Sequence, residues 1–134
     1  MFQFIKMLNG KGGMAEPCRM PTTSGEQYLH GEALVLSASG ALTRALENEL
    51  PSFIAAESYK APMEGGRPLC CYPVSPDMVF RVPVEEDLSE LKVGQSLMLT
   101  DDALNVKART GGKAVVISTE NAGKSGDKIL VSFK

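Results

Sequence analysis

The feature that most restricts the fold of this chain is a series of short apolar segments, each followed by a turn signal. In several segments the apolar side chains alternate: Met78, Phe80 and Val82 fall on one face of a strand, and Ile129 and Val131 on one face of another. Glycine, proline and polar runs separate the segments at intervals of roughly 8–12 residues, and no long amphipathic helix competes with them. The sequence predicts an all-β fold, a small β-barrel or sandwich of roughly 8–10 short strands.

Two stretches depart from the strand pattern. Residues 85–95, EEDLSELKVGQ, place Asp87 three residues before Glu90, which is the spacing of a helix capping box, and Gly94 follows as a stop signal. Residues 42–50 space their leucines for one face of a helix that Pro51 ends. We interpret residues 85–95 as one short, capped helical turn, and residues 42–50 as a strand followed by a loop or one helical turn.

The composition changes after residue 27. The first eight residues, MFQFIKML, form a candidate strand with apolar residues on both faces, whereas residues 9–27 collect glycine, proline and polar residues in the manner of a loop or tether. We therefore expect residues 1–27 to form an N-terminal strand or arm with a polar lead, and residues 28–134 to form a single β-rich domain. A chain of 134 residues can bury a conventional core.

Charge and composition restrict the partners. The formal net charge is −2, from 14 Lys and Arg against 16 Asp and Glu, and the chain has no Trp. Neither a basic field nor a base-stacking platform is present, so nucleic acid is not an expected partner. The N-terminus lacks the features of a signal peptide, and no apolar run reaches the ~18 residues of a membrane span. An odd number of cysteines, Cys18, Cys70 and Cys71, favours reduced thiols in a cytosolic setting.

A Gly-Lys-Ser triplet at residues 123–125 resembles the end of a phosphate-binding loop. The first glycine of that loop would have to stand at position 118, which is Ser118, and the residues after the triplet alternate like a strand and not like a helix. We interpret the triplet as a turn between two strands, and we predict no cofactor.

Other chemically capable residues have structural explanations. His30 is the only histidine, so His-based catalysis and Cys/His metal sites lack partners. The acidic runs at residues 85–87 and 101–102 lie beside turns, where carboxylates usually cap helices or face solvent. Cys70 and Cys71 fall in an apolar strand, one expected to point inward and one outward, with Arg67 as the nearest cation in sequence. We predict no catalytic residue and no metal site, and hence no enzyme.

The order of several segments points to a known class of protein. These segments are MFQFIKMLNGKGGMAEP, YLHGEALVLSASGALTRA, PSFIAAESY, VSPDMVFRVPVEEDLSELKVGQSLMLTDDALNV and GDKILVSF. In this order they resemble the head-decoration, or cement, proteins of tailed phages and prophages. The resemblance implies a compact β-rich body, commonly a homotrimer, on the outer surface of an assembled capsid. It also implies an N-terminal arm that becomes ordered on the capsid, and it carries over no catalytic residues.

This resemblance leads to a functional expectation. The protein is expected to be a structural component of the virion, assembled in the host bacterial cytoplasm, that bridges subunits of the major capsid protein. An exposed apolar strand is a template for pairing with another chain. We therefore predict that Phe2, Phe4 and Ile5 add a strand to a neighbouring subunit, although first strands also commonly pair inside their own domain.

An alternative reading of the sequence is a small β-barrel that binds single-stranded nucleic acid or carbohydrate. The best cluster of cations for such a site is Lys107, Arg109 and Lys113, around the Gly-Gly turn at residues 111–112. Cations at such a position are more often a solvated hairpin tip, so this alternative ranks second.

Overall fold

In a computed structural model of the chain, residues 1–8, 16–85, 91–119 and 125–134 are described. These residues form an all-β structure without helices, which confirms the predicted fold class. Their strands are β1 (Gln3–Met7), β2 (Cys18–Met20), β3 (Gln27–Tyr28), β4 (Ala33–Leu36), β5 (Leu42–Arg44), β6 (Phe53–Ala55), β7 (Tyr59–Lys60), β8 (Leu69–Pro73), β9 (Met78–Glu85), β10 (Ser96–Leu99), β11 (Val106–Thr110), β12 (Ala114–Ser118) and β13 (Lys128–Phe133).

The strand number exceeds the predicted 8–10 because several strands are only two or three residues long and lie in stretches that look like loops in the sequence. One correction concerns residues 9–27, which we expected to be a loop: Cys18–Met20 pairs with β8 as strand β2. The expected capping-box turn around Asp87 and Glu90 falls outside the described residues. Residues 42–50 form a strand followed by a turn, which agrees with the interpretation of that stretch.

The second half of the chain forms a closed five-stranded barrel, which we call the C-terminal barrel. Its strands are hydrogen-bonded in the order β9-β11-β10-β12-β13, and β13 pairs back to β9. The alternation predicted for β9 is present, because Met78, Phe80, Val82 and Val84 are all buried. Most of the Gly-Lys-Ser triplet at residues 123–125 lies outside the described residues, while the residues that follow it form the strand β13, as their alternation predicted.

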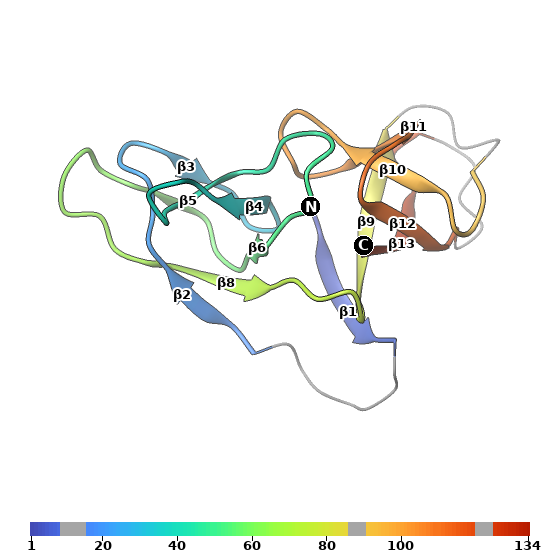
Figure 1. Ribbon diagram of the computed structural model, residues 1–134, viewed down its shortest axis with the longest axis horizontal. Coiled ribbons are helices and arrows are strands. Elements are labelled where there is room, and N and C mark those ends of the chain that lie inside the picture. The colour runs from blue at the N-terminus through green and yellow to red at the C-terminus, as the bar shows by residue number, and fades with distance from the viewer. Residues whose placement is uncertain (9–15, 86–90, 120–124) are drawn as a thin grey trace.

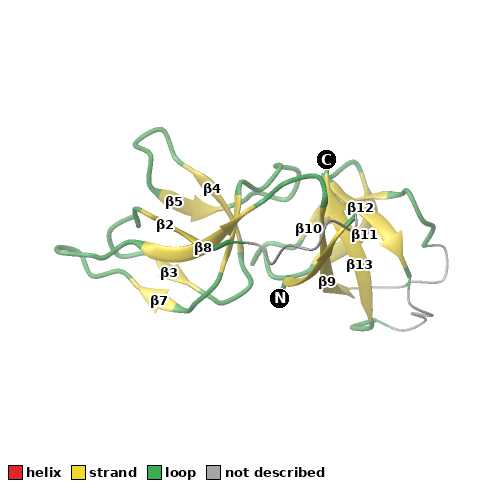
Figure 2. Ribbon diagram, turned by 90° about the horizontal axis from the view of Figure 1, so that it is seen from below, coloured by secondary structure: helices red, strands yellow, loops and turns green. Residues whose placement is uncertain are grey.

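The first half forms a second, smaller unit, which we call the N-terminal barrel. Its sheet has the order β2-β8-β6-β4-β5, and a parallel bridge between Thr22 and Leu42 joins its two edges. The short pair β3–β7 lies beside this sheet. Figure 1 shows the two barrels at opposite ends of the molecule, and Figure 2 shows the same division from below.

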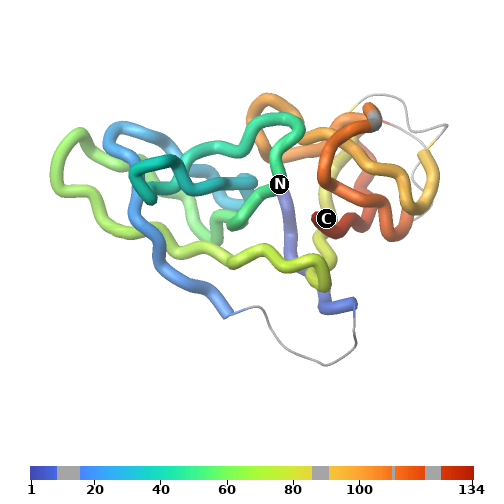
Figure 3. Tube along the Cα trace, in the orientation of Figure 1, coloured from blue at the N-terminus to red at the C-terminus, as the bar shows by residue number. Residues whose placement is uncertain are grey.

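The two barrels have the same topology. We letter the five strands of each barrel a to e in chain order. Strands a to e are β2, β4, β5, β6 and β8 in the N-terminal barrel, and β9 to β13 in the C-terminal barrel. Neighbouring strands follow the order a-c-b-d-e in both barrels, and e is hydrogen-bonded back to a. Strands a and c are parallel in both, and every other neighbouring pair is antiparallel. The molecule is therefore a tandem repeat of one five-stranded barrel. Figure 3 shows the course of the chain, from the blue and green N-terminal barrel to the yellow, orange and red C-terminal barrel.

Equivalent strands also share individual hydrogen bonds. Before strand b of each barrel, a glycine N–H donates to strand d, and strand d donates back to the residue that follows the glycine. The bonds are Gly31 N–H to Ala55 O (2.8 Å), Ala55 N–H to Glu32 O (2.9 Å), Gly94 N–H to Val116 O (2.8 Å) and Val116 N–H to Gln95 O (2.9 Å). The bc turns match as well: Gly40 and Ala103 both have positive φ, and each donates at 2.9 Å to the residue three positions before it.

The strand registers make the correspondence residue by residue. Strand a holds Arg19 in the N-terminal barrel where the C-terminal barrel holds Arg81, and Pro21, just after β2, corresponds to Pro83 in β9. The sequence shows only an irregular echo of strand–turn–strand units, since few side chains match and the connecting lengths differ.

The first strand, β1, lies between the barrels (Figure 1). It pairs with β9, while Phe2 N–H donates to Gly31 O at 2.9 Å in the other barrel. The ring centroid of Phe2 lies 5.2 Å from that of Phe133 and 6.3 Å from that of Phe80. Phe2 belongs to a continuous buried cluster that contains residues of both barrels. The N-terminal segment therefore ties the two halves of the molecule together.

Candidate functional site

The predicted binding residues Phe2, Phe4 and Ile5 lie at this junction. Strand β1 pairs with β9 of its own chain, which is the second possibility left open by the sequence. Phe2 is buried, whereas Phe4 and Ile5 are half-buried. Among the described strands β9 is the only partner of β1, so the other edge of β1 faces away from the sheet. The geometry thus keeps Phe2 as an anchor and leaves Phe4 and Ile5 partly accessible.

Aromatic contacts fix the position of β1. The ring of Phe4 lies 6.0 Å from that of Phe80 on β9, and 6.5 Å from that of Tyr72 on β8, to which it is stacked. Offset and edge-on aromatic pairs add stabilisation beyond the area that they bury. Phe4 therefore touches both barrels, and a partner that approaches the outer edge of β1 meets a strand held from both sides.

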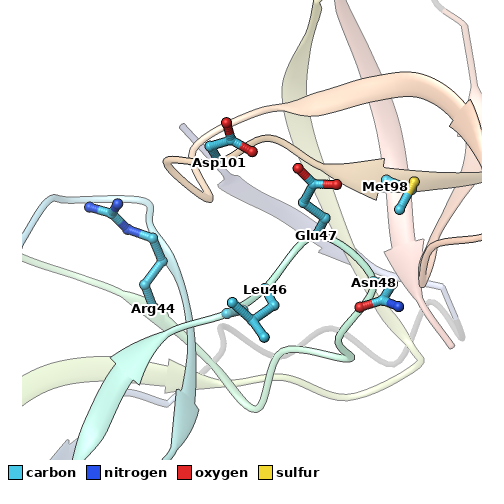
Figure 4. A pocket seen from close by; sticks show the side chains of 7 residues that line it. Arg44, Leu46, Glu47, Asn48, Met98 and Asp101 are labelled. Atoms are coloured by element: carbon cyan, nitrogen blue, oxygen red, sulfur yellow. The ribbon is translucent and has the colours of Figure 1, made fainter.

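A groove of about 430 Å³ lies on the same junction, between the loop after β5 and the end of β10. Its lining is mainly apolar, and the side chain of Leu46 in this loop is 66% exposed. In Figure 4, Leu46 lines the groove from the loop after β5 and Met98 lines it from β10. The side chain of Glu47 points toward Asp101 at the top of the view.

Ion pairs hold the loop of the groove against the C-terminal barrel. Lys107 Nζ lies 2.7 Å from Glu47 Oε1 and 3.5 Å from Asp101 Oδ1. The hydrogen bond that Lys107 donates to Glu47 is the main reason why the pKa of Lys107 is raised above its usual value. Leu99 N–H also donates to Glu47 O at 2.8 Å. Lys107 was a candidate for binding nucleic acid, but its charge is used inside the molecule.

Glu32, which lies next to the groove residue Arg44, is a buried carboxylate. Arg44 Nε lies 3.4 Å from Glu32 Oε2, close enough for an ion pair, although this oxygen has no well-aligned hydrogen bond among the described residues. Burial raises the pKa of Glu32 to about 7, and Arg44 only partly counteracts it. A carboxylate buried with one half-exposed cation is costly to ionise. Glu32 is therefore a group that titrates near neutral pH.

The acidic pairs have structural partners where the structure describes them. Asp102 Oδ1 accepts hydrogen bonds from Thr100 Oγ1 at 2.5 Å and from Leu104 N–H at 3.1 Å, which is the role of a turn residue. Of the run at residues 85–87, only Glu85 is described. In the described part of the chain, no group of three or more His, Cys, Asp or Glu residues is placed to bind a metal. The same residues contain no helix of the length and apolarity of a membrane span.

The cysteines are arranged in a way that sequence reasoning missed. Sequence alternation predicted that one of the two adjacent cysteines points inward, and the structure buries Cys71 while Cys70 is half-buried. Cys18, however, lies directly opposite Cys71, with the two Sγ atoms 3.8 Å apart. Arg67, the nearest cation in sequence, is bound to Glu57 and lies over the ring of Tyr59. Pairing of β2 with β8 was the missing information, because residues 9–27 gave no strand signal.

Comparison with known proteins yields a likeness in structure. No model of a known protein family matches the chain, and no curated protein matches it in sequence. The crystal structure of the head fiber gp8.5 N base of bacteriophage phi29 is similar, with a TM-score of 0.58 and 15% sequence identity. The match covers 89% of this chain and 95% of that one. At this identity the likeness shows a shared fold, which extends over nearly the whole of both chains.

Proposed function

We propose that this protein is a structural component of a phage virion, attached to the outer surface of the head, where it stabilises the capsid by bridging major capsid protein subunits. The observation that carries the proposal is the end-to-end likeness in fold to the base of a phage head fiber. The resemblance of the ordered sequence segments to head-decoration proteins is a second line of support. The function requires no catalysis and no cofactor.

Linkage explains how such a protein stabilises a shell. A ligand that binds the assembled lattice but not the loose subunits stabilises the lattice by about 2.7 kcal/mol per site at a hundred times Kd. A homotrimer, as the resemblance implies, adds effective concentration because several weak contacts form together. Two barrels joined by a shared buried cluster give the stiffness that bridging needs.

The outer edge of β1 is the contact surface that we propose. Strand addition to an exposed edge supplies main-chain hydrogen bonds, and side chains on alternate positions supply specificity. Phe4 and Ile5 are half-buried and can contribute apolar contact, while the buried ring of Phe2 anchors the strand in the core.

Co-sedimentation with assembled heads tests the proposal. The full chain is expected to sediment with heads of the phage that encodes it and to remain in solution with unassembled capsid subunits. Ile5→Glu is expected to reduce head binding at least tenfold, whereas Met63→Glu, at a side chain 76% exposed and distant in sequence, leaves it unchanged. Absence of head binding by the folded wild-type protein sinks the proposal, and salt-dependent retention on single-stranded DNA in its place supports the binding-module alternative.

A further inference from the structure

Outside the junction, Cys18 and Cys71 are two thiols that lie close together. They face each other on the antiparallel strands β2 and β8, and their Sγ atoms are 3.8 Å apart. Residues directly opposite in an antiparallel pair have Cα atoms about 4.5–5.5 Å apart. This range lies inside the roughly 4.4–6.8 Å that disulfides span. A bond between these two sulfurs therefore needs side-chain rotation and no change of the backbone.

The repeat shows what the thiol pair replaces. The same register positions in the C-terminal barrel hold Phe80 and Val131, which are buried. Phe80 is surrounded there by other aromatic rings. In the N-terminal barrel the corresponding strand, β2, has three residues and three pairs to β8, and the single bridge to the opposite edge of the sheet is made by Thr22, two residues after β2. The N-terminal barrel thus has two thiols at the place where its counterpart has a large apolar contact.

We propose that Cys18 and Cys71 form an intramolecular disulfide by exchange with a low-molecular-weight disulfide, and that this bond fastens β2 to the sheet of the N-terminal barrel. Cys70 is the remaining thiol. Cys70 lies opposite Arg19, one residue along the strand from the Cys18–Cys71 pair, so its side chain points to the other face of the sheet.

The exchange is balanced in two steps. The more accessible Cys18 loses its proton and attacks the small disulfide, which forms a mixed disulfide and releases one small thiolate. Cys71 then loses its proton and attacks the Cys18 sulfur, which forms the protein disulfide and releases the second thiolate. The two thiolates take up the two protons, so the two cysteines are oxidised and the small disulfide is reduced to two thiols.

The second step is the slow one. In the reduced protein the pKa of the Cys71 thiol is raised to about 12, mainly by burial, and burial also disfavours the Cys71 thiolate in the mixed disulfide. Since only the thiolate attacks, ring closure accelerates about tenfold for each pH unit between neutral and alkaline pH. The mixed disulfide on Cys18 is therefore expected to accumulate first at pH 7 and to convert to the intramolecular bond at pH 9.

The disulfide constrains the unfolded chain, because it closes a loop from Cys18 to Cys71 that contains nearly the whole N-terminal barrel. A bond of this kind is expected to raise the melting temperature by roughly 5–15 °C. If the protein acts on a virion, as proposed above, the bond forms when the particle leaves the reducing cytoplasm. That consequence rests on the proposed function, but the reaction itself does not.

The test uses the full chain with Cys70→Ser, which leaves the pair intact, treated with oxidised glutathione at pH 9. We expect a product lighter by two hydrogen atoms, without alkylatable thiols, that yields a cross-linked peptide containing Cys18 and Cys71. Its melting temperature should rise and return to the starting value with dithiothreitol. Two further variants in this background, Cys18→Ser and Cys71→Val, should show neither the intramolecular cross-link nor the rise in melting temperature. Valine is chosen because Val131 occupies the position equivalent to Cys71 in the other barrel.

Three outcomes of this experiment would overturn the proposal. If both thiols of the Cys70→Ser protein remain alkylatable, end as separate glutathione adducts or form only intermolecular dimers, the proposal is overturned. This readout does not require Cys71→Val to fold and does not involve heads. Failure here therefore leaves the proposed head binding untouched, and failure of head binding leaves the disulfide untouched.

Discussion

The two barrels share one topology but are closed and filled in different ways. In the C-terminal barrel, strands a and c form two residue pairs, Val84 with Val106 and Glu85 with Lys107, around a cluster rich in aromatic and branched side chains. In the N-terminal barrel the same closure is a single bridge around a smaller cluster. The difference shows that the same strand topology is stabilised mainly by core packing in the C-terminal barrel, whereas the N-terminal barrel needs additional interactions.

Polar side chains provide that support in the N-terminal barrel. Leu42 O, at the closure, accepts hydrogen bonds from Tyr28 Oη at 2.7 Å and from Thr23 Oγ1 at 2.8 Å. Tyr28 Oη also accepts from Thr23 N–H at 2.8 Å, and burial raises the pKa of Tyr28. Satisfied buried networks of this kind define one arrangement of the strands, since each unmade bond leaves a buried polar group unpaired. Leu42 N–H completes the closure by donating to Pro21 O at 2.8 Å.

The largest expected effect comes from removing the contact between the barrels. Phe2→Ala deletes a buried ring that packs on Phe80 and Phe133, and we expect the free energy of unfolding to fall by about 3–5 kcal/mol in chemical denaturation. Hydrogen exchange should show that the amides of β9 and β13 lose more protection than those of β4 and β6. Met63→Ala, at an exposed position, is the control and should change stability by less than about 0.5 kcal/mol. A loss confined to the N-terminal barrel would contradict the role given to β1.

The glycines before strand b give a matched pair of substitutions. Both have positive φ, 82° at Gly31 and 89° at Gly94. A Cβ at Gly31 would lie 2.5 Å from Met1 Cβ and 3.1 Å from Phe2 N, whereas nothing lies within 4 Å of a Cβ at Gly94. We expect Gly94→Ala to cost about 1–2 kcal/mol from backbone strain, and Gly31→Ala about 2–4 kcal/mol because crowding is added.

Thermal or urea unfolding of the two glycine variants measures this difference. A further variant of Gly31→Ala that lacks residues 1 and 2 separates the two causes. In that background the additional cost at Gly31 should disappear, leaving the strain that Gly94→Ala shows alone. Equal costs for the two substitutions in the full chain would mean that β1 does not press on Gly31.

Sequence reasoning could find the strands but not the repeat. Alternation of apolar side chains identified β9, which alternates over most of its length, and β13, in which the residues on both faces from Ile129 to Phe133 are buried. Strand β2 escaped detection because its three residues, Cys-Arg-Met, follow a polar run and precede Pro21. The correspondence of the two barrels lies in backbone hydrogen bonds and in positive φ angles, at Gly40 in one barrel and Ala103 in the other. Such features constrain the chain without requiring the same side chains.

The candidate site was predicted in part for the same reason. Apolar periodicity indicated that β1 is a strand, but both faces of MFQFIKML are apolar, so the pattern could not choose between a partner chain and β9. The thiol pair and the ion pair of Lys107 with Glu47 join residues far apart in sequence. No local pattern encodes such contacts, because they depend on which strands become neighbours.

Glu32 and Gln95 occupy equivalent positions and should respond to pH differently. The carboxyl of Glu32 has a pKa of 4.5 when unfolded and about 7 when folded, so the native state binds the proton more tightly. Stability is therefore fully present below pH 4.5 and falls as the pH rises to about 7. We expect Glu32→Gln to stabilise the protein by about 1–3 kcal/mol at pH 8 and to have little effect at pH 4.5.

Urea denaturation between pH 4 and pH 8 measures this effect. The reciprocal change, Gln95→Glu, is the control: residue 95 is half-buried, so a carboxylate there should leave the pH dependence nearly as in the wild type. If Glu32→Gln shows the same slope of stability against pH as the unchanged chain, the titrating group lies elsewhere. The ion pair with Arg44 reduces the expected gain, because glutamine leaves this arginine without its buried partner.

The smallest effect is expected where the loop after β5 is fastened to the other barrel by Lys107 and Glu47. Ion pairs near the surface contribute little, since solvent screens the charges and two long side chains must be ordered. Lys107→Met should lower the melting temperature by roughly 1–4 °C, and the loss should shrink as salt is added. In a double-mutant cycle Glu47→Gln is expected to add almost nothing to Lys107→Met, because each removes the same contact. Fully additive losses would mean that the two residues act independently and that main-chain bonds, such as that from Leu99 N–H to Glu47 O, alone hold the barrels together at the groove.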